Sequence, residues 1–156
     1  MTVITRRPEN RLGKVIWIPG GKTVAQALED AQGNLDEIRT QELDVLRAKL
    51  EEIQALGKRN QLTPNAADIA SLYALSSEVI DIGGLFGLPE LGQAAFSLCE
   101  LLDRLQSRKA WNWPAVQVHL HGLLILADPD KTPPEARSAV VDGLRQVCER
   151  VARASA

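Results

Sequence analysis

From residue 23 onward, apolar side chains recur at every third or fourth position, which is the spacing of an amphipathic helix. Clusters of proline, glycine, asparagine or aspartate interrupt this repeat and divide it into segments. No segment combines alternating β-branched residues with hairpin turns. The pattern therefore predicts helices over residues 23–56, 63–84, 88–105, 111–127 and 132–151.

Residues that commonly cap helices stand at several of the predicted starts. Thr23 precedes the first helix, and Thr63 precedes Pro64, which suits the first position of the second helix. Thr132 begins a capping-box pattern at the last helix, with Glu135 three residues later. These signals predict a hydroxyl cap at each of the three helix starts.

The first helix contains one potential interruption, at Gly33-Asn34. Glycine weakens a helix and asparagine can cap a new one, so we expect either one long kinked helix or a short helix followed by a long one.

Short loops between amphipathic helices favour antiparallel neighbours. We therefore expect an all-α fold, an up-and-down bundle over residues 23–156. Residues 1–22 are expected to form an extended leader whose apolar patch at residues 15–18 could pack on the bundle.

Composition and charge place the chain among ordinary globular proteins. Its 156 residues suit one domain, and a formal net charge of −2 with dispersed basic residues predicts no nucleic-acid partner. The most apolar run, residues 120–127, is too short to cross a membrane, and the N-terminus lacks the apolar stretch of a signal peptide. We expect a soluble, cytoplasmic protein.

Cys99 and Cys148 have no second ligand nearby, so reduced core thiols are expected, with no metal or cofactor.

The familiar catalytic motifs are absent from the sequence. It has no phosphate-binding glycine loop, no H-E-x-x-H, no G-x-S-x-G and no C-x-x-C. His119 and His121 lie two positions apart, about 200° around a helix, so they cannot chelate one metal together. We therefore expect no enzyme, and two histidines that are ordinary parts of a bundle.

The stretch from Leu72 to Leu105 resembles the core of histidine phosphotransfer (Hpt) domains. In that family a histidine on an exposed helix face is followed by lysine three positions on and glycine four positions on. Small residues, a hydrophobic-glycine turn and a partner helix rich in alanine and leucine come next. The matching residues here are Gly83-Gly84, Phe86-Gly87 with Leu91, and Ala94-Ala95 with Leu98 and Leu101-Leu102. The segment at residues 113–120 also looks like alphaproteobacterial relatives of chemotaxis-operon Hpt proteins. The resemblance implies a four-helix Hpt-type bundle with an additional C-terminal helix.

In this resemblance the phosphoacceptor position falls on Ser77, counting back from Phe86-Gly87. The lysine position falls on Ile80 and the glycine position on Asp81. Phosphotransfer from an aspartyl phosphate needs a neutral imidazole as nucleophile, and the lysine would neutralise the transferring phosphoryl group. All three residues have changed, and Glu78 adds another negative charge. We therefore expect a pseudo-Hpt in a two-component or chemotaxis phosphorelay, with a candidate docking surface at Ser76, Ser77, Glu78, Ile80, Asp81 and Gly84.

The expected partners are a response-regulator receiver domain or a histidine kinase, bound without carrying phosphate. One alternative is active phosphotransfer through His119 or His121. Another is a helical scaffold or oligomerisation protein, with the amphipathic first helix forming the seam of a homodimer. A plain helical hairpin, in which Gly83-Gly84 is only a C-terminal cap, is the alternative without a docking role.

Overall fold

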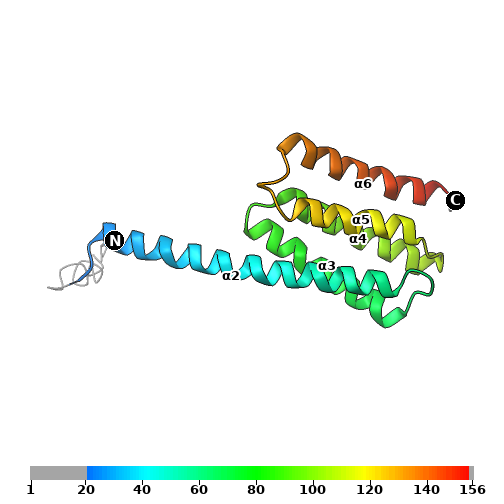
Figure 1. Ribbon diagram of the computed structural model, residues 1–156, viewed down its shortest axis with the longest axis horizontal. Helices are drawn as coiled ribbons and strands as arrows, with labels where there is room; N and C mark the ends of the chain where they lie inside the picture. The colour runs from blue at the N-terminus through cyan, green and yellow to red at the C-terminus, as the bar shows by residue number, and fades with distance from the viewer. Residues whose placement is uncertain (1–20, 155–156) are drawn as a thin grey trace, which may run out of the picture. The chain divides into compact units, whose positions relative to one another are not determined.

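A computed structural model describes residues 21–154 of the chain (Figure 1). This range contains helices and no strand, which confirms the all-α prediction. The helices are α2 (Val24–Arg59), α3 (Ala66–Leu85), α4 (Pro89–Arg108), α5 (Trp113–Leu126) and α6 (Pro134–Ala154). The chain divides into two compact units, Met1–Ile38 and Arg39–Ala156. Residues 1–20, which make up most of the predicted leader, lie outside the described range.

The described part of the first unit is the beginning of α2. The backbone N–H of Gln26 donates to Thr23 Oγ1 (3.2 Å), and the N–H of Thr23 donates to Gln26 Oε1 (2.9 Å). This reciprocal pair is a capping box, so the predicted Thr23 cap is confirmed. The helix continues through Gly33 and Asn34, and the alternative of a separate short helix is wrong. A single glycine costs a helix about 1 kcal/mol, which is not enough to end one.

The second unit is a helical bundle around one apolar core. Its consecutive helices run in alternating directions (Figure 1), as the short loops predict. Helix α4 packs against α3, α5 and α6, and α5 also packs against α6. Residues 39–59 of α2 join the bundle through buried Leu46, Leu50 and Ile53. The Gln54 amide fixes α2 to α5 by donating to the Leu120 carbonyl (2.8 Å).

The N-terminal cap of helix α3 lies two residues later than the sequence predicts. Its cap is Asn65, whose side-chain oxygen accepts from the N–H of Ala67 (2.9 Å), so the predicted Thr63 cap is wrong. The buried Asn60 side chain explains the difference. Its Oδ1 accepts from the Asn65 N–H (2.6 Å), and its Nδ2 donates to the Leu56 carbonyl (2.8 Å). These bonds hold Asn65 in the extended conformation that a cap requires.

The remaining three helices begin in different ways. Pro89 lies in the first turn of α4, and Asn112 caps α5 by accepting from the Ala115 N–H (3.1 Å). The predicted capping box of α6 does not form. Thr132 instead donates its hydroxyl to the Ile125 carbonyl (3.0 Å), near the end of the preceding helix, and α6 begins at Pro134.

Candidate functional site

Two adjacent serines of α3 point in different directions. Ser76 is fully buried, and its hydroxyl donates to the Leu72 carbonyl one turn earlier (2.7 Å). Ser77 is exposed, because successive helical residues are about 100° apart. The residue at the acceptor position of the Hpt pattern therefore faces solvent. The prediction that Ser76 is part of the docking surface is wrong, because a fully buried side chain cannot contact a partner.

A close approach of two helices holds this surface in place. A Cβ added at Gly83 would lie 2.9 Å from the backbone nitrogen of Gly92, so only glycine allows α3 and α4 to come this near. Gly84 has open space around it and is exposed. Both glycines lie inside α3, whose C-terminal cap is Phe86, so the predicted cap at Gly83-Gly84 is wrong, whereas a plain helical hairpin without a docking role stays an alternative. The positive φ of the turn (70°) belongs to Gly87, the glycine of the hydrophobic-glycine turn.

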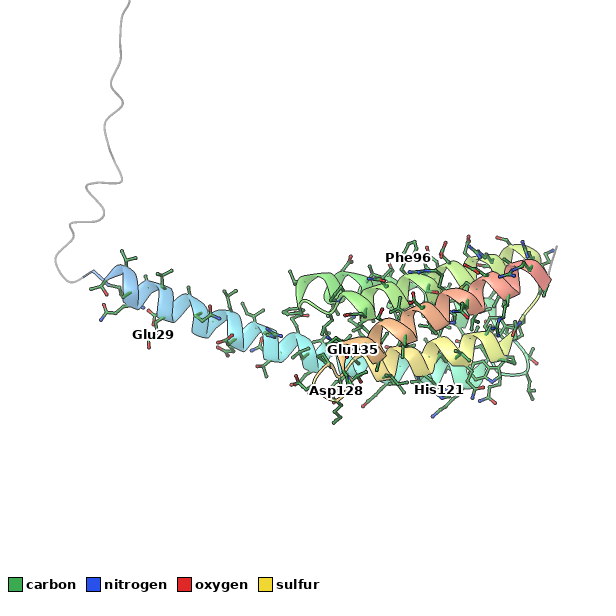
Figure 2. The ribbon with its side chains drawn as sticks, turned by 90° about the horizontal axis from the view of Figure 1, so that it is seen from above. Glu29, Phe96, His121, Asp128 and Glu135 are labelled. Carbon is green, nitrogen blue, oxygen red and sulfur yellow. The ribbon has the colours of Figure 1, made fainter. Side chains whose placement is uncertain are left out.

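Beside Ser77 lies a shallow hollow of about 290 Å³ between α3 and α4. Its lining residues are Tyr73, Ser77, Ile80, Phe96, Cys99, Glu100 and Asp103. Phe96, which is labelled in Figure 2, lies on α4. Its side chain is 56% exposed and that of Tyr73 is 46% exposed, although aromatic side chains usually bury most of their area. The sequence could have indicated that Phe96 is exposed, because Phe96 lies on a different face of the helix from the apolar residues Leu91, Ala94 and Leu98.

Acidic residues lie in this hollow and next to its lining residues in the sequence: Glu100 and Asp103 line it, Glu78 follows Ser77, and Asp81 follows Ile80. Glu78 pairs with Lys49 of α2, and Glu100 pairs with Arg104 (3.5 Å). Asp81 and Asp103 are exposed, and their carboxylates form no hydrogen bond or ion pair with any residue in the described range. The surface therefore combines an apolar centre with uncompensated negative charge.

The chemistry around Ser77 is poorly suited to phosphate transfer. Within residues 21–154 no side chain hydrogen-bonds the Ser77 hydroxyl, so nothing acts as its base. Ile80 occupies the position one turn further on and offers no cation. Cys99 lies under the hollow, and burial raises its pKa to about 11, which keeps it a neutral thiol.

His119 lies inside the bundle rather than on a surface. It is fully buried, and its Nδ1 lies 2.8 Å from the Ala115 carbonyl, to which it donates. Its Nε2 accepts from the Ser97 hydroxyl at 3.0 Å. Burial lowers the pKa of His119, so the ring is neutral. With both nitrogens occupied and no exposure, His119 cannot attack a phosphoryl group on a partner.

His121 is exposed, and Figure 2 shows it on the opposite side of the bundle from Phe96. It lines an apolar groove of about 450 Å³ between α5 and α6, together with Arg150. The two histidines thus lie on different faces of α5, as their spacing predicts, and neither lines the hollow beside Ser77.

Residues 21–154 hold no group of three or more His, Cys, Asp or Glu side chains that could bind a metal ion. No helix in that range combines the length and apolar character needed to cross a membrane. Comparison with known proteins finds no matching family, no matching curated protein and no matching solved structure.

Proposed function

We propose that this chain is a degenerate Hpt-like signalling module of a cytoplasmic two-component or chemotaxis phosphorelay. It binds a receiver domain or a histidine kinase through the α3–α4 surface and carries no phosphate. In this proposal residues 39–59 of α2 and helices α3, α4 and α5 form the four-helix Hpt-type bundle, and α6 is the additional helix. The observation that carries the proposal is the exposure of Ser77 beside an apolar hollow, at the position where the Hpt pattern has its histidine.

The surface around Ser77 favours binding over transfer. A receiver's phosphorylated pocket is itself acidic, and here Glu78 and Asp81 would stand against it where the family has a lysine and a glycine. Like charges at a contact cost binding energy. The proposed contact therefore relies on Tyr73, Ile80 and Phe96, with the acidic rim meeting basic side chains of the partner.

Titration calorimetry with purified receiver and kinase domains from the source organism tests the binding role. We expect at least one domain to bind the wild-type chain, and Phe96→Ala to weaken that binding at least about tenfold, because a large apolar contact is lost. Leu124→Ala is the matched control. Leu124 is a comparably exposed apolar residue (45%) on α5, outside the proposed surface, and its loss should leave binding unchanged. No binding by any domain would refute the proposal.

The exposure of His121 supports one competing function, phosphotransfer from the α5–α6 groove. Incubation of the chain with a phosphorylated receiver distinguishes the two. We expect no acid-labile phosphate on the wild-type chain. Label that disappears in His121→Gln would establish phosphotransfer through His121 and contradict a phosphate-free role.

A further inference from the structure

The segment Val24–Ile38 of α2 carries a line of apolar side chains that face solvent. The exposed fractions are 77% for Val24, 66% for Leu28, 60% for Leu35 and 51% for Ile38, and the exposed Ala31 completes the line. The steps between them are four, three, four and three residues. This is the a/d spacing of a heptad repeat, whose mean period of 3.5 residues matches a second helix wound around the first.

The charged residues of the segment all avoid this line. Glu29, Asp30, Asp36 and Glu37 occupy the outer b and c positions of the heptad, and the segment contains no basic residue. Glu29 (Figure 2) is one of this outer set. The e and g positions that flank the seam are Ala25, Ala27, Gln32 and Asn34, all uncharged. Two identical segments can therefore pair without bringing like charges together at the seam.

Packing within the chain adds little to the stability of this segment. No side chain of residues 24–38 is buried, and Gly33 and Asn34 weaken the helix, so it depends on the Thr23–Gln26 capping box and on its continuity with the rest of α2. Its apolar side chains contribute to stability only when something covers them. We infer that residues 24–38 pair with the same residues of a second copy of the chain in a two-stranded coiled coil.

The uncharged flanks favour a second copy over a different partner. Coiled coils that select another chain usually do so through complementary charges at e and g, and this segment has none there. About two heptads form a short seam, so the dimer should be weak and its population should depend on concentration. This inference is independent of the role of the Ser77 surface.

Sedimentation equilibrium of the full chain, from about 1 to 300 µM, tests the inference over the affinity range of weak dimers. We expect a monomer–dimer equilibrium. Leu28→Asn with Leu35→Asn should weaken it at least about tenfold, because two core layers of the seam lose their apolar contact. Glu29→Gln, which changes an outer position, is the control and should leave the equilibrium unchanged or slightly stronger.

Circular dichroism of the double variant shows whether the rest of the chain stays folded, which we expect because Leu28 and Leu35 are mostly exposed. Gly33→Ala gives a second test with the opposite sign. An added Cβ meets no atom within 4 Å, so the substitution should strengthen the helix and tighten the dimer several-fold. A wild-type chain that stays monomeric throughout, or a dimer that survives the double substitution, would overturn the inference.

Discussion

His119 connects three helices through a buried polar cluster. Ser97 of α4 and Cys148 of α6 both approach its Nε2, at 3.0 Å and 3.5 Å, while its Nδ1 bonds the Ala115 carbonyl within α5. Because Nδ1 is the donor, Nε2 carries no proton and accepts from the Ser97 hydroxyl. A second proton on the ring would remove that acceptor and place a charge in the core. The cluster is therefore stable only with a neutral imidazole.

This requirement predicts a pH dependence of stability. Burial lowers the pKa of His119 in the folded chain below its ordinary value of 6.5. As the pH falls below 6.5, the unfolded chain therefore binds a proton at this histidine while the folded chain does not. The stabilisation is complete above pH 6.5 and decreases as the pH falls below it, by at most about 1.4 kcal/mol per pH unit. Urea unfolding at a series of pH values from 7.5 down to 5, a range that spans the ordinary histidine pKa, measures the slope with which the free energy of unfolding changes with pH.

Two substitutions separate His119 from the other titrating groups. His119→Gln should reduce the slope, although it lowers stability at every pH because the cluster loses a partner. His121→Gln changes an exposed ring and should retain the wild-type slope. Equal slopes in all three proteins would show that His119 does not titrate as described.

Among the helices, α3 and α4 form the pair that positions the candidate site. Their contact is closest at Gly83, where a Cβ would meet the Gly92 backbone nitrogen at 2.9 Å and the Leu88 carbonyl oxygen at 3.0 Å. These neighbours are backbone atoms, which cannot rotate away as a side chain can. A larger residue at Gly83 must therefore move one helix relative to the other.

Substitution of adjacent glycines tests this contact. Gly83→Ala should lower the free energy of unfolding by about 1–3 kcal/mol, the usual cost of overpacking. Gly84→Ala should be neutral or stabilising by up to about 1 kcal/mol, because no atom lies within 4 Å and alanine favours a helix. Thermal and urea unfolding of both variants give the comparison. A Gly83 variant as stable as the Gly84 variant would contradict the close packing.

Local sequence signals predict the helices well but not always where they begin. The apolar stripes and the cap at Thr23 depend on residues a few positions apart, and these predictions are confirmed. The predicted caps at Thr63 and Thr132 fail because contacts with the preceding helix decide the outcome. Asn60 fixes the start of α3, and the Thr132 hydroxyl donates to the Ile125 carbonyl instead of capping α6. The spacing of residues along the sequence does not reveal contacts of this kind.

For the molecule as a whole, the sequence indicates the candidate surface only in part. Counting from Phe86-Gly87 leads to Ser77, which is exposed, yet the same reasoning includes the buried Ser76 and omits Phe96. Spacing can locate a position along a helix to within a turn, whereas the face it occupies depends on how neighbouring helices pack. The hollow beside Ser77 needs residues from two helices, so it emerges only in the folded chain.

In the proposed function, a signalling domain binds at the α3–α4 surface. Backbone amide chemical shifts of the ¹⁵N-labelled full chain, followed during titration with a receiver or kinase domain that binds in calorimetry, test it residue by residue. The proposed function predicts the largest changes in residues 73–81 of α3 and 93–103 of α4. Changes concentrated in the α5–α6 groove around His121, or no changes with any domain, would contradict it.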